Sequence, residues 1–472
     1  MTVKITIKNA GKTHEIELQD DDVGKALKLA IQKKTLIPPE RQKILIKGGK
    51  VNDDTPVSKL DLSKPIMVLG TPDKELPQKP VEKVVFLEDL KQVMSTNNEP
   101  TGLTNLGNTC YLNSSLQALF NIADVKKAVK SYQGGSNALI NSMKELFNRM
   151  EKKEQRISPQ LFLIMFRQLF PQFAERDTMG YKQQDAEEAF SQILSELRRE
   201  FGLDDDFKIT FKNITKCTAA TQEEEIVTFE DAYKLNCHID IKINFLRDGI
   251  LMGLRETIER HSDTLGQNAE YEVSRTITRL PKYLTVHFVR FFWKRETSTK
   301  SKILRKVQFP FELDLAEMLD PSIKQEKIEM RDKFRKVSKD NEEVVRDFKK
   351  QKRDPALTPM EQMEEEKLKI ESIKTKFRDD IQSISKVDID STTENPSSVY
   401  ELQAVITHQG STAESGHYQA FVKDNEGLED DLWWKFNDDK VSKVSQDKIE
   451  QLAGGGESDS ALILIYRAAG LE

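Results

Sequence analysis

The chain of 472 residues contains only three cysteines, Cys110, Cys217 and Cys237, and they lie far apart in the sequence. So few thiols cannot build a disulfide framework, and their number is typical of proteins in a reducing compartment. No two of them form a CxxC pair, the usual half of a structural zinc site. We therefore expect no disulfide, no zinc and no other cofactor, and a cytoplasmic and nuclear location.

Long apolar runs and an excess of positive charge are also absent. No run approaches the ~18 apolar residues of a membrane span, and the alternating N-terminus MTVKITIKNA lacks the apolar core of a signal peptide. The net charge of −6 and the pI near 5.8 argue against a nucleic-acid-binding protein. We expect a chain that binds neither membrane nor nucleic acid and is monomeric when free.

The most distinctive stretch is residues 102–117, GLTNLGNTCYLNSSLQ. Its first half favours turns and helix caps through Asn105, Gly107 and Thr109, whereas its second half spaces apolar residues as on one face of a helix. Cys110 is therefore predicted at a helix N-terminus, where unpaired N–H groups and the macrodipole lower the pKa of a thiol. Asn105 can offer its side-chain amide to an oxyanion. The alternative is a cysteine simply packed beneath the helix.

The N-terminal part of the chain has the pattern of a small α+β module. Two strands joined by a turn at 9–12 precede an amphipathic helix at 22–34, and the strands KILIK and IMVLG follow it. Scattered prolines then indicate a linker. The expected division is residues 1–72, a linker at 73–100 and one large domain at 101–469.

The large domain changes character along its length. Residues 103–202 are mostly helical in pattern, and the segments that follow alternate as strands. Helices first and strands later predict an α+β fold with a large antiparallel sheet. Residues 321–398 interrupt the strands and predict an inserted, charged helical hairpin, with either a partner-contact role or no specific role. Its expected apolar positions are Met330, Phe334, Val337, Val344, Phe348, Ile370, Ile373, Phe377, Ile381 and Ile384.

A cysteine hydrolase needs a base, and two of the six histidines lie near predicted strand ends. His408 and His417 flank one loop that contains Gly and Ser. Position alone does not decide which of the two is the base. In a hairpin centred near Gly427, His417 lies directly opposite Asn437, whose side-chain oxygen can accept a hydrogen bond from Nδ1–H of the ring. A single bulge would instead present Asp438 to the histidine.

Residues 102–117 resemble the cysteine box of the ubiquitin-specific proteases nearly residue for residue. The stretch GHYQAF, which contains His417, resembles the histidine box of the same family. This resemblance implies that Cys110 is the nucleophile, His417 the base and Asn105 the oxyanion donor. It places Asn437 as the residue that orients the histidine, where many members of the family have Asp.

Further stretches resemble the same family. YKQQDAEEAF resembles the glutamine–aspartate box, which implies that Gln183 and Asp185 hold the C-terminal tail of the substrate. The resemblance also implies a papain-like fold with a helical thumb and an antiparallel palm and fingers, although this chain lacks the two CxxC pairs of many fingers. The loops at 291–310 and 409–416 match loops that cover the tail groove in the proteasome-bound branch of the family. A self-blocked free enzyme is therefore expected.

The stretches IPPE and KILIKGGK near the N-terminus resemble ubiquitin itself. Because the chain continues beyond this unit, the resemblance implies an integral β-grasp ubiquitin-like domain over residues 1–72. In such proteases this domain engages the 26S proteasome regulatory particle. By analogy with the apolar face of ubiquitin, Leu45 and Leu69 are the candidate contact residues, and a role in the core is the alternative for both.

Together, these resemblances imply a proteasome-associated deubiquitinase that hydrolyses isopeptide bonds at the C-terminal glycine of ubiquitin in polyubiquitinated proteins. The main alternative is a regulatory subunit that chiefly binds ubiquitin and the proteasome without catalysis. A papain-like protease of ordinary peptides is a third interpretation, and the ubiquitin-like domain and the glutamine–aspartate box argue against it.

Overall fold

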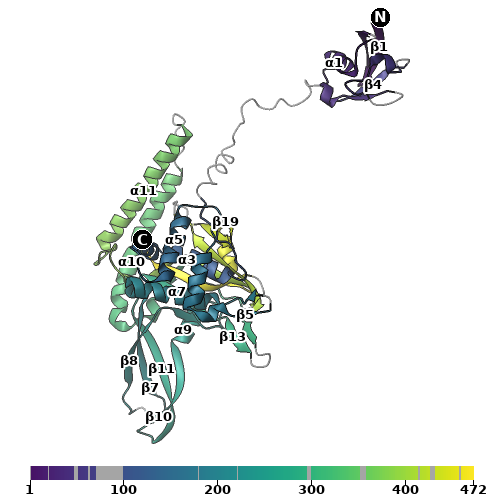
Figure 1. Cartoon of the computed structure of the whole chain (residues 1–472). Coiled ribbons are helices and arrows are strands. Elements are labelled where there is room, and N and C mark those ends of the chain that lie inside the picture. Colours follow the sequence, from purple (N-terminus) through teal and green to yellow (C-terminus); the bar gives the residue numbers. More distant parts are fainter. Residues whose placement is uncertain are drawn as a thin grey trace. The chain divides into compact units, whose positions relative to one another are not determined.

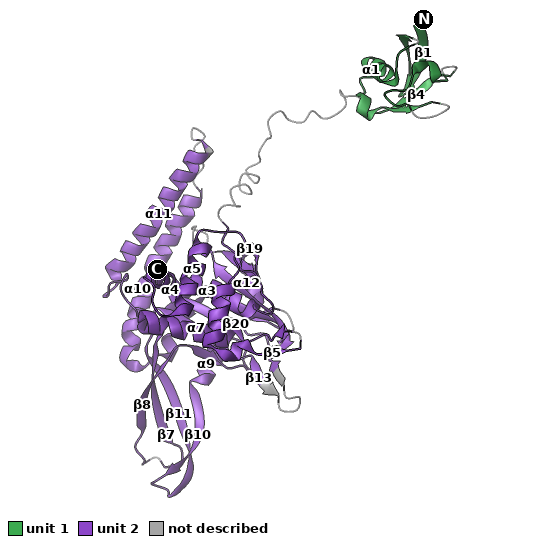
Figure 2. Ribbon diagram, in the orientation of Figure 1, with its two compact units in different colours: residues 1–94 green, residues 95–472 purple. Residues whose placement is uncertain are grey.

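The computed structural model divides the chain into two compact units, Met1–Met94 and Ser95–Glu472 (Figure 2). The residues that it describes are 2–19, 21–46, 51–61, 64–70, 99–178, 180–220, 222–294, 299–350, 358–412, 415–425, 431–456 and 459–471. The predicted linker at 73–100 therefore falls almost wholly outside the described residues. Within these ranges, no helix is long and apolar enough to cross a membrane.

The N-terminal unit is a four-stranded sheet with one helix packed against it. Its elements are β1 (Thr2–Asn9), β2 (Lys12–Gln19), α1 (Gly24–Thr35), β3 (Lys43–Leu45) and β4 (Ile66–Leu69), with short 3₁₀ turns at Pro39–Arg41 and Val57–Lys59. The strand order is β2-β1-β4-β3, and the central pair β1 and β4 is parallel. Alternate strand residues are buried against the helix, and the predicted β-grasp fold is confirmed.

Helices dominate the first part of the second unit, as predicted (Figure 1). They are α3 (Cys110–Phe120), α4 (Ala123–Ser131), α5 (Ala138–Glu151), α6 (Gln160–Leu169), α7 (Ala186–Phe201) and α8 (Asp204–Phe207). Helix α3 is buried from Cys110 to Leu119, because it lies between other helices and strands β16, β17 and β18 of the main sheet. Its position is thereby fixed from both sides.

Two sheets follow the helices. The palm sheet has the order β19-β18-β17-β16-β20-β12-β9, with β14 and β15 paired to β16 and β13 paired to β14. Its strands are β9 (Leu235–Cys237), β12 (Tyr283–Phe288), β13 (Phe291–Lys294), β14 (Thr299–Lys302), β15 (Glu312–Asp314), β16 (Val399–Thr412), β17 (Ser415–Lys423), β18 (Leu432–Asn437), β19 (Lys440–Ser445) and β20 (Ser460–Ala468). The pair β9 and β12 is parallel, and the other pairs are antiparallel.

The fingers sheet has the order β10-β11-β7-β8 and is antiparallel. Its strands are β7 (Ile209–Cys217), β8 (Ile226–Ala232), β10 (Arg255–Ser262) and β11 (Gln267–Arg279). Short elements complete the unit: β5 (Arg176–Asp177), β6 (Gly180–Tyr181), α9 (Leu246–Gly253), α12 (Gln446–Glu450), and 3₁₀ turns at Pro171–Ala174, Ala316–Met318 and Gln451–Ala453. The α+β class is therefore confirmed.

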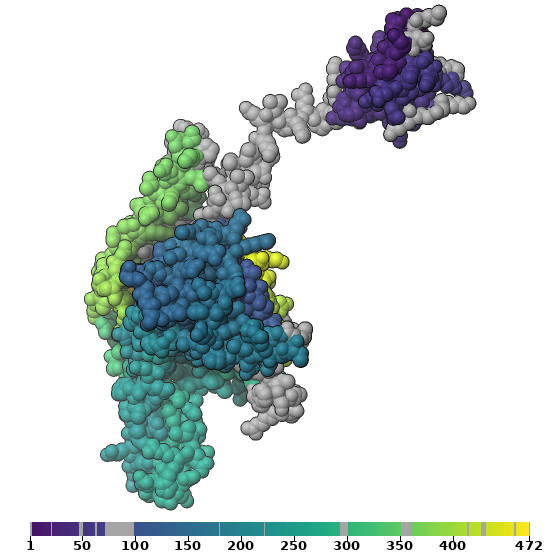
Figure 3. All heavy atoms as spheres, viewed as in Figure 1, coloured from purple at the N-terminus to yellow at the C-terminus, as the bar shows by residue number. Residues whose placement is uncertain are grey.

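The charged segment forms the predicted pair of helices, α10 (Pro321–Lys350) and α11 (Pro359–Ile384), which lies against the helical layer (Figure 3). A capping box between Thr358 and Glu361 starts α11. At the base of the hairpin, Phe334 and Ile381 are buried in the palm core. The predicted apolar stripe is wrong at Val344, which is exposed, because the buried apolar contacts of the hairpin lie at its base.

Candidate active site

Helix α3 begins at Cys110, so the predicted helix N-terminus at the cysteine is confirmed. Two left-handed residues, Gly107 (φ 94°) and Asn108 (φ 53°), turn the chain just before it. The side-chain oxygen of Asn105 accepts hydrogen bonds from the N–H groups of Gly107, at 2.9 Å, and Thr109, at 3.3 Å. These bonds hold the cysteine loop, residues 102–109, in one conformation.

The predicted low pKa of the thiol is wrong. Cys110 is only 2% exposed, and burial raises its pKa from 9.0 to about 11, with the Asp438 carboxylate adding to the rise. The backbone N–H groups of Tyr418 and of the first helical turn act in the opposite direction. Because the loss of hydration outweighs the helix N-terminus, the thiol is protonated at neutral pH in this structure.

His417, at the start of β17, pairs with Asn437 at the end of β18. The distance between Nε2 of the histidine and Oδ1 of the asparagine is 2.6 Å. The predicted contact at Nδ1 is therefore wrong, and Nδ1 is the ring nitrogen that remains for a proton from the thiol. Since the thiol lies at the Tyr418 N–H, Cys110 lies beside the strand residue that follows His417.

The predicted register of this hairpin is also wrong, by two residues. Ala420 lies opposite Phe436, so His417 and Asn437 are diagonal and not directly opposed. A shift of two residues preserves the faces of a strand, and diagonal neighbours remain within reach of long side chains. The error in register therefore does not affect the prediction that Asn437 is the partner of His417.

Asp438 holds the cysteine loop. Its left-handed backbone (φ 52°) ends β18, and its carboxylate accepts hydrogen bonds from Nδ2 of Asn105 at 3.0 Å and from Nδ2 of Asn113 at 2.8 Å. Its carbonyl accepts from the N–H of Leu103 at 2.9 Å. Sequence reasoning missed this arrangement. The signal that was available is the pair of aspartates directly after a strand, since Asp tolerates the left-handed region.

The glutamine–aspartate segment lies at the start of α7. Asp185 is the N-cap, and its carboxylate accepts from the Glu187 N–H at 2.9 Å. Among the described residues, Nε2 of Gln183 and the hydroxyl of Tyr418 are buried without a hydrogen-bond partner. Burial, followed by the charges of Asp185 and Cys110, raises the pKa of Tyr418. The segment therefore adjoins the strand of His417, with two donors that lack acceptors.

The second candidate base, His408, is packed away from the thiol. Its ring is fully buried between Tyr418, at 4.6 Å, and Phe291, at 5.3 Å between ring centroids. Within the described part of the chain, neither ring nitrogen has a hydrogen-bond partner. Burial, followed by the positive charge of Lys302, lowers its pKa to about 3. A neutral, enclosed ring suits packing, so the structure favours His417 as the base.

The two loops predicted to cover the tail groove are joined to each other, although residues 295–298 and 413–414 lie outside the described ranges. Ser301 of β14 pairs with Thr412 of β16. The ammonium of Lys302 is buried and donates to the carbonyl of His408 at 2.5 Å. Burial lowers the pKa of Lys302 to about 8. Arg290 directly precedes β13. Its buried guanidinium donates to the carbonyls of Ile303 and Arg305, just after β14, and to those of Ala453 and Ala461.

In the N-terminal unit, Leu45 and Leu69 are exposed. Their exposed fractions are 44% and 46%, and Met67, directly opposite Leu45, is 50% exposed. The alternative of a core position is therefore wrong for both leucines. The three side chains form an apolar surface on β3 and β4.

Comparison with known proteins agrees with this geometry. The family model described as "Ubiquitin carboxyl-terminal hydrolase" matches residues 101–466, and that of the "Ubiquitin family" matches residues 5–68. The chain is 37% identical to ubiquitin carboxyl-terminal hydrolase 6 of Schizosaccharomyces pombe, over 99% of both chains. It is 33% identical to ubiquitin carboxyl-terminal hydrolase 7 of Arabidopsis thaliana, over 92% of this chain and 91% of the relative.

A relative in an animal is similar over nearly as much of the chain. Ubiquitin carboxyl-terminal hydrolase 14 of Caenorhabditis elegans is 30% identical over 92% of this chain and 87% of its own length. Both the ubiquitin-like unit and the cysteine-bearing domain therefore lie within the matched length. The chain belongs to the cysteine-type ubiquitin carboxyl-terminal hydrolases and carries an N-terminal domain of the ubiquitin family.

Proposed function

We propose that the protein is a deubiquitinase of the proteasome, which hydrolyses the isopeptide bond at the C-terminal glycine of ubiquitin and so recycles ubiquitin from conjugates. The observation that carries the proposal is the hydrogen-bonded pair of His417 and Asn437 next to the thiol of Cys110. Nucleophile, base and orienting residue are the minimum set for thiol hydrolysis. They lie in the domain that matches the hydrolase family.

In the proposed mechanism, Nδ1 of His417 takes the proton of the Cys110 thiol while Nε2 is held by Asn437. The sulfur attacks the glycine carbonyl, and the amide of Asn105, which Asp438 orients, donates to the oxyanion. The C–N bond breaks as the histidine gives its proton to the leaving lysine amine. The base then activates water, which cleaves the thioester and restores the thiol.

Substrate binding is assigned to Gln183 and Asp185, in agreement with the buried donor at Gln183. Asp185 caps α7, so its contribution is to position the segment as well as to bind the tail. The raised pKa of Cys110 and the joined loops support a free enzyme of low activity. We expect activity to rise when the enzyme binds the proteasome.

The domain assignment completes the proposal. Residues 1–72 form the ubiquitin-like domain, 73–100 the linker and 101–469 the catalytic domain, with 321–398 inserted. The exposed surface at Leu45 and Leu69 binds the regulatory particle of the 26S proteasome, and the protein acts in the cytoplasm and nucleus as a monomer when free.

A test of the proposal is labelling by ubiquitin with an electrophile at its C-terminus, with and without proteasomes. We expect slow labelling of the free wild-type protein, faster labelling with proteasomes and none for Cys110→Ala. Labelling of the alanine variant, or equal rates with and without proteasomes, would contradict the assigned nucleophile or the self-blocked state. If effects on proteasome activity persist in Cys110→Ala, a regulatory role exists beside catalysis.

A further inference from the structure

A cavity of about 970 Å³ lies between the α10–α11 hairpin, the helical layer and the palm. Helix α3 separates it from the catalytic residues, because Cys110 is the first residue of α3 and Phe120, the last, lines the cavity. An 11-residue helix is about 16 Å long. We call this cavity the hairpin groove. An occupant of the hairpin groove would leave the catalytic cleft free.

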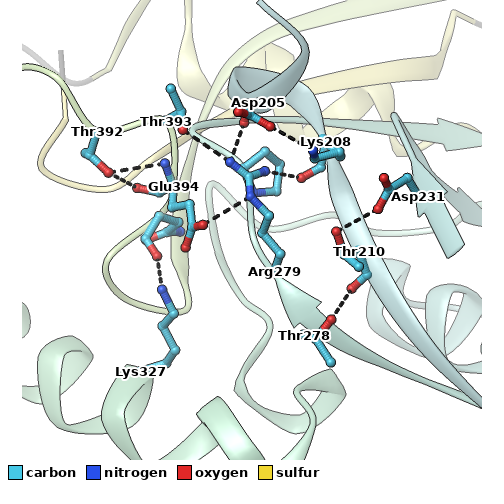
Figure 4. A network of polar contacts seen from close by, with 12 residues as sticks. Asp205, Lys208, Thr210, Asp231, Thr278, Arg279, Lys327, Thr392, Thr393 and Glu394 are labelled. Carbon is cyan, nitrogen blue, oxygen red and sulfur yellow. Dashed lines mark hydrogen bonds and ion pairs between the residues drawn. The ribbon is translucent and has the colours of Figure 1, made fainter. Parts of the chain in front are cut away.

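The wall formed by the hairpin is held in place at its base (Figure 4). The guanidinium of Arg279 donates to Glu394 at 3.1 Å, to Thr393 at 3.2 Å and to the carbonyl of Asp205 at 2.8 Å. Lys327 of α10 donates to the carbonyl of Asn395. These contacts tie the end of the insertion to both the fingers and α10, and the buried base of the hairpin adds an apolar anchor. The position of the hairpin wall is therefore fixed at its base.

The lining of the groove carries more positive than negative charge, on a chain whose net charge is −6. Eight of the lining residues are Lys or Arg and six are Asp or Glu. Three of the six carboxylates already pair with cations: Glu151 with Lys130, Asp390 with Arg378, and Asp424 with Lys443. Only one of these three cations, Arg378, is itself in the lining, so the pairs offset more of the negative than of the positive charge there.

Three of the lining cations lie on facing walls. Arg346 and Lys349 are three residues apart on α10 and share one face, and Lys126 of α4 lines the opposite wall. None of these three has a carboxylate partner among the described residues. Phe120 and Trp434 add apolar surface between the walls. This combination suits acidic side chains that alternate with apolar ones, because salt bridges to the walls and apolar burial are both available.

We propose that the hairpin groove is a docking site for an acidic segment of a partner protein that also carries apolar side chains. The volume exceeds what a single inorganic anion fills, and the apolar surface of Phe120 and Trp434 suits a segment that carries apolar side chains between its carboxylates. A partner is favoured over a ubiquitin conjugate, because the groove lies at the far end of α3 from Cys110. The inference does not depend on the catalytic assignment, and it gives the charged insertion a function as a wall of the site.

The test uses the full-length protein and a fluorescein-labelled peptide of about 14 residues that alternates Glu with Leu and Phe, with binding followed by fluorescence anisotropy. We expect saturable binding that weakens with salt, and a loss of affinity of about tenfold or more in the double variant Arg346→Glu, Lys349→Glu. The matched control is Lys333→Glu, Lys336→Glu, which makes the same charge change at exposed positions of the same helix outside the groove. The control should bind as the wild type does.

Several outcomes would overturn the proposal. These are no saturable binding, equal binding by the groove variant, or equal binding of a peptide with Lys in place of Glu. Competition by a ubiquitin conjugate would assign the groove to the substrate and not to a partner. Hydrolysis of a ubiquitin substrate, measured on the same samples, should be unchanged in both double variants. A loss there would point to a failure of the fold or of the catalytic proposal, and not of the docking proposal.

Discussion

At the scale of single residues, the candidate nucleophile and the candidate orienting residue are both uncharged. The thiol of Cys110 is protonated, and the partner of His417 is an amide and not a carboxylate. The residue that orients His417 therefore offers no negative charge to stabilise an imidazolium formed during the reaction. Asp438 supplies the nearby negative charge, and it is engaged with the cysteine loop.

The raised pKa of Cys110 predicts how the thiol reacts with a small alkylating reagent. The thiolate is the reactive form, so the logarithm of the alkylation rate should rise linearly with pH to about 9.5 without a plateau. The folded pKa is above the unfolded one, so ionisation of this thiol lowers stability as pH rises from 9.0 to about 11. Rates can be measured by mass spectrometry with Cys110→Ala as the blank. A plateau below pH 8 would contradict the assignment.

The role of Asp438 predicts that Asp438→Asn loses activity through misorientation of Asn105. An asparagine has one side-chain acceptor, whereas Asp438 accepts from both Asn105 and Asn113. We expect kcat to fall by about tenfold to a hundredfold with little change in KM, since charge-assisted hydrogen bonds contribute ~1.5–3 kcal/mol. The neighbouring change Asp439→Asn removes only a 3.9 Å surface ion pair with Arg156 and should leave kcat near that of the wild type. Equal effects of the two changes would refute this role.

At the scale of elements, the β13–β14 hairpin and the end of β16 behave as one unit. One strand pair and one buried ammonium join them, and the same strand of the sheet leads to β17 and His417. A displacement of the hairpin would therefore be transmitted to the loop before the histidine. The buried ring of His408, between Phe291 and Tyr418, lies at the centre of this unit.

This arrangement predicts that Lys302→Met raises the activity of the free enzyme. Methionine keeps the bulk of the side chain but cannot donate to the carbonyl of His408, so the hairpin loses its charged tie. We expect kcat/KM on a ubiquitin substrate to rise by about tenfold without proteasomes and to change little with them. Lys306→Met, at an exposed position of the same loop, is the control. Unchanged activity of Lys302→Met, or a lower folded fraction of this variant than of the wild type by circular dichroism, would argue against a hydrogen bond that restrains activity.

At the scale of the whole molecule, the chain contains two units that each have a core of their own. The N-terminal unit offers an exposed apolar surface, and the larger unit holds the candidate active site and the hairpin groove. The proposed docking surface and the candidate active site therefore lie in separate units with separate cores.

The separation predicts that Leu45→Ala, Leu69→Ala weakens binding to proteasomes by about tenfold or more while activity on a small ubiquitin substrate is unchanged. Both side chains are exposed, so the melting temperature should shift little. Leu29→Ala, at an exposed position of α1, is the matched control, and binding can be followed by co-sedimentation. Equal binding of the double variant and the control would assign docking to another surface.

The sequence predicts those features of the site that depend on local patterns. The helix start at Cys110, the hairpin of β17 and β18, and the order of strands and helix in the N-terminal unit all follow from turn residues and periodicity. The thiol pKa, the register and the role of Asp438 do not, because each depends on what packs around the group in three dimensions. Burial of Cys110 by the palm reverses the effect of its helix, and the left-handed turn at Asp438 brings its carboxylate to a loop more than 300 residues earlier.

The buried, protonated thiol has a consequence for redox chemistry. Peroxide oxidises the thiolate, and the ladder from sulfenic to sulfonic acid begins only where that anion is accessible. Cys110 is 2% exposed and its pKa is about 11, so the thiol in this structure is shielded from this chemistry. If the proposed activation by proteasomes exposes and ionises the thiol, oxidative inactivation is confined to the activated molecules.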